Sequence, residues 1–140
     1  MDQRIIYQRD DGGVSIIVPS DCGLTIEEIA EKDVPTGTPY TIVDVASIPT
    51  DRTFRNAWTS SGGAIETDFT KAQDIAHEMR RTARSAEFAP LDIDVTIPDR
   101  SVKAEAERVA VRAKYDAMQI AIDGATGIDE LLATVVRSIP

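Results

Sequence analysis

The period of the apolar residues changes once along the chain, within residues 39–58. Before this segment, short β-branched runs alternate with turn residues, which is typical of strands. After it, apolar residues recur three and four positions apart, which is typical of helices. We therefore expect an α+β fold of one domain or two closely packed parts, with a β-rich N-terminal part over residues 1–58 and a helical C-terminal part over residues 59–140.

The first half predicts a small antiparallel sheet with a short helix. Residues 4–9 and 14–18 are strand-like, and the Asp-Asp-Gly-Gly sequence between them suits the tight reversal of a hairpin. Residues 40–44 are expected to form a third strand. Thr25 and Glu28 have the spacing of a capping box, which predicts a helix that covers the sheet. Residues 64–68 are expected to add a brief strand.

The second half predicts three helices and one further strand. The first helix is expected to start at Thr70, where Gln73 completes a capping box, and to break at Pro90. Residues 91–97 alternate with period two, which predicts a strand that pairs with the sheet edge or with another copy of the chain. The longest helix is expected over about residues 99–122, forming an antiparallel hairpin with the last helix.

The first candidate partner-binding segment is residues 51–58, which contain the single tryptophan of the chain. On one helical turn Phe54 and Trp58 would share a face, and Arg52 and Arg55 would lie off it. One interpretation is that the two aromatic side chains fill the gap between sheet and helices. The other is that all four residues form an anchor for a partner, because tryptophan and arginine are enriched in interface hot spots.

The second candidate lies on the helix expected over residues 99–122, which carries two apolar stripes, the second rotated from the first. One stripe comprises Val102, Ala106, Val109, Ala113, Ala117 and Ile120, and the other comprises Val111, Tyr115, Met118 and Ile122. A helix that is apolar on more than one side needs contacts on more than one side. These contacts come from the other helices or from a second chain, so Tyr115, Met118 and Ile122 become candidate partner-binding residues and a homo-oligomer becomes a candidate assembly.

Few side chains of the sequence are suited to catalysis or metal binding. His77 is the single histidine and Cys22 the single cysteine, so we expect neither a zinc site nor a disulfide. His77 is expected to be a surface residue on the flank of its helix. Asp92 and Asp94 could hold Ca²⁺ or act as acid and base, but the solvent face of a strand accounts for them as well. We therefore predict no catalytic residue, no metal, no cofactor and no enzymatic activity.

The charge of the chain limits its partners. The net charge is −9, from 24 acidic and 15 basic residues, so nucleic acid and membrane surfaces would repel it. The acidity suits high solubility or a basic protein partner. No apolar run approaches the roughly 20 residues of a membrane span, and no signal peptide is expected. These features predict a protein that is cytoplasmic, or that leaves the cell as part of something larger.

Several segments of the sequence together resemble those of one family, the most specific being Asp-Arg-Thr-Phe-Arg-Asn-Ala-Trp at residues 51–58. The others lie at residues 4–7, 11–19, 26–30, 32–35, 40–44, 87–92, 104–108, 122–123 and 128–131. With them the chain resembles small proteins of tailed phages and prophages, often encoded beside tail or tail-fibre genes, which are similar to tail-fibre assembly chaperones.

The resemblance implies a protein that binds phage tail or tail-fibre proteins, as an assembly chaperone or a minor virion component. It places the chain in the host cytoplasm during assembly, or in the virion, and it carries over no catalytic residue. The alternative is a small acidic phage protein that binds and regulates a host protein.

Overall fold

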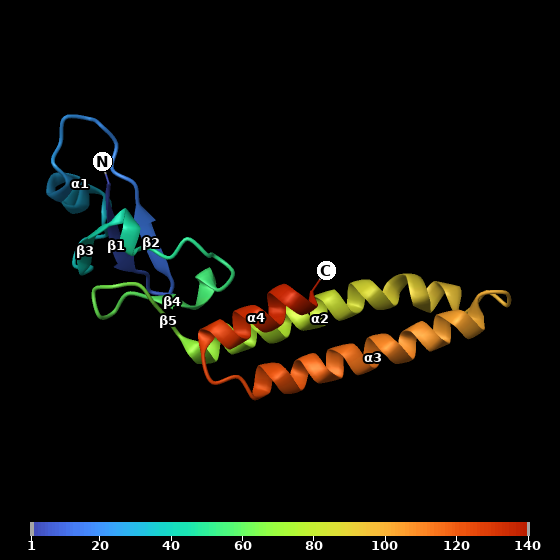
Figure 1. The fold of residues 1–140 in the computed structure, drawn as a ribbon. Helices are drawn as coiled ribbons and strands as arrows, with labels where there is room; N and C mark the ends of the chain where they lie inside the picture. The colour runs from blue at the N-terminus through green and yellow to red at the C-terminus, as the bar shows by residue number, and fades with distance from the viewer. Residues whose placement is uncertain (1, 140) are drawn as a thin grey trace. The chain divides into compact units, whose positions relative to one another are not determined.

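The computed structural model describes residues 2–139, and the chain divides into two compact units, Met1–Asp68 and Phe69–Pro140 (Figure 1). The first unit contains a small antiparallel sheet and the second is helical, which confirms the predicted α+β class. The boundary falls after Asp68 rather than after Trp58. The reason is that β4 (Trp58–Thr59) pairs with β5 (Glu66–Thr67) in a short antiparallel ladder, as expected for residues 64–68, and this ladder belongs to the first unit.

Three antiparallel strands in the order β2-β1-β3 form the main sheet of the N-terminal unit. They are β1 (Gln3–Gln8), β2 (Val14–Ile17) and β3 (Tyr40–Asp44). Ile5 of the central strand lies opposite Ile17 on one side and Ile42 on the other. Because side chains alternate across a strand, these three isoleucines share one face and Ile6 lies on the other. Both faces of the central strand are therefore apolar.

Helix α1 (Ile26–Asp33) covers the face that carries Ile5. Its buried residues Ile29 and Ala30 pack in one cluster with Ile5. The predicted capping box is present: the Thr25 hydroxyl accepts from the Glu28 amide at 3.2 Å, and the Thr25 amide donates to the Glu28 carboxylate at 2.7 Å. These two bonds fix the start of the helix that closes this side of the sheet.

Trp58 covers the opposite face of the sheet. It forms a buried cluster with Ile6 and Val14, and four half-buried apolar residues pack against the cluster. These four are Ile16, Val43, Ile48 and Ile65. The expected helical turn in this region is a short 3-10 helix at Arg55–Ala57 that ends where β4 begins. The N-terminal unit thus has a core on each side of its sheet.

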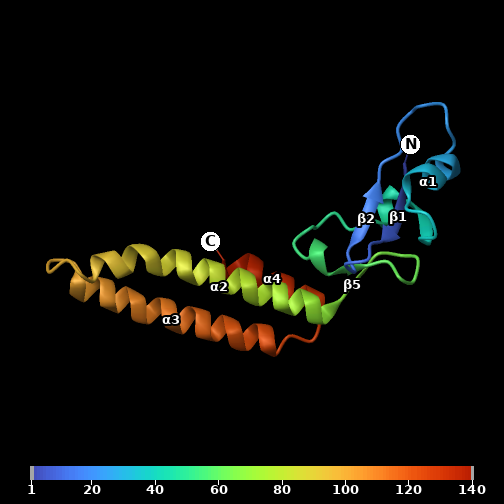
Figure 2. The ribbon, with the colours of Figure 1, turned by 180° about the vertical axis from the view of Figure 1, so that it is seen from behind.

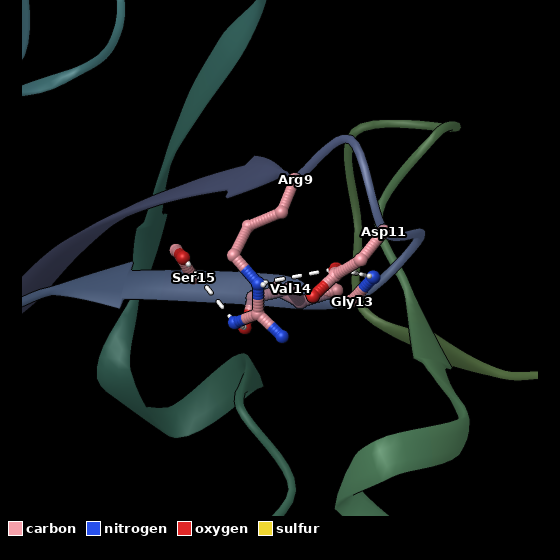
Figure 3. A network of polar contacts seen from close by, with 5 residues as sticks. All are labelled: Arg9, Asp11, Gly13, Val14 and Ser15. Atoms are coloured by element: carbon pink, nitrogen blue, oxygen red, sulfur yellow. Dashed lines mark hydrogen bonds and ion pairs between the residues drawn. The ribbon is translucent and has the colours of Figure 1, made fainter.

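The loop between β1 and β2 is closed by a dense set of hydrogen bonds (Figure 3). The Arg9 amide donates to the Gly13 carbonyl at 2.7 Å, and the Gly12 amide donates to the Arg9 carbonyl at 3.0 Å. Asp11 Oδ1 accepts from the Gly13 amide at 2.8 Å, and Arg9 Nε lies 3.2 Å from the same oxygen. Gly12 has φ of 85°, so the predicted reversal takes place where glycine is favoured.

The C-terminal unit is a bundle of three helices that run in alternating directions (Figures 1 and 2). They are α2 (Phe69–Asp94), α3 (Ser101–Asp123) and α4 (Ile128–Ser138). Each helix contacts the other two. The antiparallel hairpin predicted for the last two helices is confirmed. Helix α3 ends at Asp123, close to the expected end at about residue 122, and Gly124 is its C-cap.

The strand predicted at residues 91–97 is wrong, because α2 continues through Pro90 to Asp94. Proline removes one backbone hydrogen bond, and Pro90 lies on the exposed side of the helix. Phe88, Leu91 and Val95 also have helical spacing, and their side chains are buried or half-buried. This short segment fits both periods, and the helical one prevails where α2 can pack along α3. The longest helix is consequently α2 and not α3.

The capping box predicted for Thr70 and Gln73 is also wrong. Helix α2 begins at Phe69, so Thr70 lies inside it. The Gln73 side-chain amide donates instead to the carbonyl oxygen of Ile122, at 3.0 Å. The Gln73 side chain thus contacts the end of α3, whereas the sequence pattern had placed it at the start of its own helix.

Candidate functional site

Most of the predicted partner-binding residues are buried within the chain. Phe54 and Trp58 are 4% and 2% exposed, and Trp58 belongs to the core of the N-terminal unit. Tyr115, Met118 and Ile122 are buried on α3. These five side chains are therefore not available as surface anchors in this conformation, which favours the interpretation of Trp58 as a core residue.

The two arginines of the first candidate segment are more accessible. Arg52 is exposed and Arg55 is half-buried. The Arg55 guanidinium lies over the Trp58 ring, 5.2 Å from its centroid, in a cation–π contact. Asp51, beside them, accepts a hydrogen bond from the Thr53 amide at 2.9 Å, forming a local turn instead of a helix cap.

The other apolar stripe of α3 lies on the outside of the bundle. Val102 is 83% exposed, Val109 is 55% exposed and Ile120 is 72% exposed. The alanines between them, Ala106, Ala113 and Ala117, are exposed as well. We call these six residues the outer stripe. They lie on the side of α3 opposite Tyr115, Met118 and Ile122, because the two sets are about half a turn apart on a helical wheel.

The sequence contains a signal that distinguishes the two stripes. The buried stripe carries tyrosine, methionine and isoleucine, whereas half of the outer stripe is alanine. Large apolar side chains contribute more free energy on burial than alanine does, so the bulkier stripe is the better candidate for the core. The prediction assigned partner binding to the bulkier stripe, and the structure exposes the smaller one.

A shallow apolar hollow of about 480 Å³ lies along the first part of the outer stripe. Its lining comprises Val95, Ser101, Val102, Glu105, Ala106 and Val109. Five of these belong to α3 and Val95 comes from the turn after α2. The hollow gives the outer stripe a concave surface in which an apolar side chain could be seated.

A second hollow, of about 400 Å³, lies between α2 and α3 and is rich in arginine. It is lined by Arg84, Ser85, Phe88, Ala89, Asp92, Arg108 and Arg112. We call it the arginine hollow. Arg84 and Arg112 both approach the ring of Phe88, with their guanidinium carbons 4.6 Å and 5.9 Å from the ring centroid. Sequence analysis missed this cluster because its members come from two helices.

Glu105 connects the two hollows. It lines the apolar hollow, and its carboxylate oxygens lie 2.7 Å from Arg108 Nη1 and 3.3 Å from Arg112 Nη1. These two guanidiniums hold the pKa of Glu105 below its usual range. Arg108 Nε is also 3.1 Å from Asp92 Oδ1. Asp92 is therefore a partner of an arginine in the bundle and not the solvent face of a strand, and Asp94 pairs with Arg100 at 3.3 Å.

His77 is less exposed than expected, with 15% of its side chain accessible. Its Nε2 atom lies 2.8 Å from Asp123 Oδ1, and Arg80 Nε donates to its Nδ1 atom at 3.4 Å. Arg80 is itself buried, which sequence analysis did not predict. These contacts join α2 to the end of α3 and give His77 a structural role.

The described part of the chain, residues 2–139, contains no group of three or more histidine, cysteine, aspartate or glutamate side chains placed to hold a metal ion. Within the same residues, no helix has the length and apolarity that crossing a membrane requires. Cys22 is exposed and lies far along the chain from His77. The candidate functional surface is therefore the outer stripe together with the arginine hollow.

Comparison with known proteins finds no matching family model, no matching curated protein and no matching solved structure.

Proposed function

We propose that this chain is a non-enzymatic protein that binds another protein through the outer stripe of α3. With the resemblance of its sequence, the proposal extends to a tailed-phage protein that acts as a tail or tail-fibre assembly chaperone, or as a minor virion component. Its partners would be tail or tail-fibre proteins, and it would act in the host cytoplasm during assembly. This setting rests on the resemblance, and the mode of action rests on the geometry of α3.

The observation that supports the proposal is the exposure of Val102, Val109 and Ile120 on a helix whose opposite side is already packed. Burying a valine or isoleucine side chain that was exposed contributes about 1.5–3 kcal/mol. Three such residues would supply a useful part of the free energy that association requires, although ordering costs reduce the net gain. A folding role does not account for them, because they contribute little to the core while they are exposed.

The test is co-purification of the chain with each tail or tail-fibre protein encoded beside it, followed by size-exclusion chromatography with light scattering. The decisive variant is Val109→Asp, which places a charge in the centre of the outer stripe. Gln119→Glu is the matched control, because it makes the same change in charge at an exposed position of α3 outside the stripe. Circular dichroism of both variants checks that the helices are intact.

We expect the parent chain and Gln119→Glu to bind a tail protein and Val109→Asp to lose most of the binding. A chain that captures none of these proteins would overturn the assignment to tail assembly. Capture of a single host protein instead would favour the alternative of a host-directed regulator. Equal binding by Val109→Asp and Gln119→Glu would show that the contact lies elsewhere.

A further inference from the structure

The arginine hollow concentrates positive charge on a chain whose net charge is −9. Three of its lining residues, Arg84, Arg108 and Arg112, carry guanidinium groups. Asp92 and Glu105 are the carboxylates paired with them. Three positive groups against two negative ones leave a local surplus of positive charge, which no partner within the cluster neutralises.

The three guanidinium groups differ in how many of their N–H donors are already bonded within the chain. Arg108 contacts both Asp92 and Glu105. Arg112 makes one hydrogen bond, from its Nη1 atom to Glu105, although a guanidinium has five N–H donors. Arg84 has no ion pair with any residue in the described part of the chain, and its guanidinium lies over the Phe88 ring. Arg84 and Arg112 therefore retain donors for an external acceptor.

Phe88 holds these two guanidiniums in place. A guanidinium near the face of an aromatic ring interacts through its own flat face, which leaves the N–H groups at its edge free. The ring is 9% exposed, so it is a fixed support and not a mobile side chain. Two guanidiniums that are already oriented in the free protein lose less entropy when they bind an acceptor. The Ser85 hydroxyl lines the same hollow and can add a donor.

We propose that the arginine hollow binds the carboxylate of an acidic protein segment, held by Arg84 and Arg112. The proposal rests on the proposed function in taking the ligand to be part of a protein, and it adds the chemistry of that partner. Arginine suits this task because its planar fork matches the two oxygens of a carboxylate. The acidic segment would lie beside the outer stripe, since Arg112 and Val109 are neighbours on one helix.

The net negative charge of the chain does not prevent this binding. At physiological ionic strength charges are screened over about 8 Å, so an acidic ligand in the hollow responds chiefly to the groups around it. Those groups carry the positive surplus described above. The acidic remainder of the chain slows the approach of an acidic partner, and higher salt will weaken the contact once it has formed.

The experiment is a titration of the full chain with a capped helical peptide that carries leucines on one face and glutamates along the edge. A second peptide has glutamine in place of every glutamate, and inorganic phosphate is titrated separately. Binding is followed through the NMR signals of the arginine Nε–H groups. The variants are Arg84→Gln and Arg112→Gln, with Arg81→Gln as the control. Arg81 is an exposed arginine of α2, the helix that carries Arg84, and it pairs with Glu78.

We expect the glutamate peptide to shift the Arg84 and Arg112 signals, and each of their variants to weaken its binding about tenfold. Arg81→Gln should bind as the parent chain does. Arg84→Gln is the safer variant, because Arg84 has no ion pair to lose within the described bundle. Equal binding of the glutamine peptide, equal loss in Arg81→Gln, or binding of phosphate without the peptide would each overturn the proposal.

Failure here is distinguishable from failure of the proposed function. If the peptide does not bind but a tail protein is captured and Val109→Asp abolishes the capture, the carboxylate site is wrong and protein binding stands. If the peptide binds at Arg84 and Arg112 but no tail protein is captured, the site stands and the phage assignment is wrong.

Discussion

His77 Nε2 on α2 lies 2.8 Å from Asp123 Oδ1, the last residue of α3. Because Arg80 Nε–H points at Nδ1 of the ring, the geometry assigns the imidazole proton to Nε2, which donates to the carboxylate. The Gln73 side chain donates to the Ile122 carbonyl beside it. Two side chains of α2 thus hold the end of α3.

Replacing His77 by alanine should lower the free energy of unfolding by about 1–2 kcal/mol, since a hydrogen bond from a largely buried imidazole to the exposed Asp123 carboxylate is lost. Urea denaturation measures the change. A double-mutant cycle with Asp123→Asn isolates the pair, and Asp116→Asn, at an exposed acid of the same helix, is the control. A coupling energy near zero would show that His77 and Asp123 do not support each other.

Trp58→Ala should lower the free energy of unfolding by about 3–5 kcal/mol, because it removes a buried indole from the cluster with Ile6 and Val14. Val18→Ala is the control in the same unit, since Val18 is 64% exposed and its change should be within about 0.5 kcal/mol. Equilibrium denaturation measures both. A Trp58→Ala protein that keeps its stability would contradict the placement of Trp58 in the core.

Tyr115 should make the protein less stable at high pH. Burial raises the pKa of Tyr115 from its usual 10 to about 12, and the Glu87 carboxylate adds to the rise. Between these values the unfolded phenol loses its proton while the folded one keeps it. The free energy of unfolding therefore falls as pH increases, by at most about 1.4 kcal/mol per pH unit.

Tyr115→Phe separates this effect from the titration of lysines. Its free energy of unfolding should increasingly exceed that of the parent chain as pH rises from 10 to 12, because only the parent loses stability through the tyrosine. At neutral pH the substitution should be nearly neutral, because the geometry gives the buried hydroxyl no hydrogen bond among the described residues, and Glu87 acts on it chiefly as a nearby charge. Parallel pH profiles for the two proteins would contradict the raised pKa.

Pro90→Ala should raise the free energy of unfolding by about 1 kcal/mol or more. Proline within a helix removes one backbone hydrogen bond and crowds the preceding turn, whereas alanine favours helix. Part of the gain is offset because the unfolded chain becomes more flexible. Thermal denaturation measures the change, with Ala89→Gly as a helix-weakening comparison. A decrease for Pro90→Ala would show that the proline shapes a contact that α2 needs.

Gly12→Ala should destabilise the hairpin between β1 and β2, by about 1–2 kcal/mol, because a side chain at a φ of 85° is strained. Gly13→Ala tests the neighbouring position, where an added methyl group would meet the guanidinium of Arg9. The guanidinium is the end of a long side chain that is 44% solvent-accessible, and it can move at the cost of its bonds to Asp11 and Val14, so we expect the smaller loss at Gly13. Urea denaturation of both variants gives the order.

The elements that were predicted correctly are those whose signals are local. The β1–β2 hairpin follows from two glycines between β-branched runs, and the start of α1 follows from Thr25 and Glu28. In each case the groups that fix the conformation are within a few residues of one another. The class of the fold was predicted for the same reason.

The errors arose where distant groups compete for the same residues. Gln73 could bond to its own helix start or to Ile122, and residues 91–97 could alternate as a strand or continue a helix along α3. A local sequence pattern carries no information about how much a contact with a distant residue would stabilise the fold. The arginine hollow was missed for this reason, because Arg84 and Arg112 become neighbours when α2 and α3 pack together.

The sequence by itself determined that a strand-rich first part is followed by a helical second part, how its main turn reverses, and that α3 would be apolar on two sides. Packing in three dimensions decided which of those sides is buried. Tyr115, Met118 and Ile122 occupy the core, and Val102, Val109 and Ile120 remain in solvent. The physical reason is that the spacing of apolar residues shows which faces of a helix are apolar, but not which face is covered. Which face is buried depends on the surfaces of α2 and α4 that pack against it.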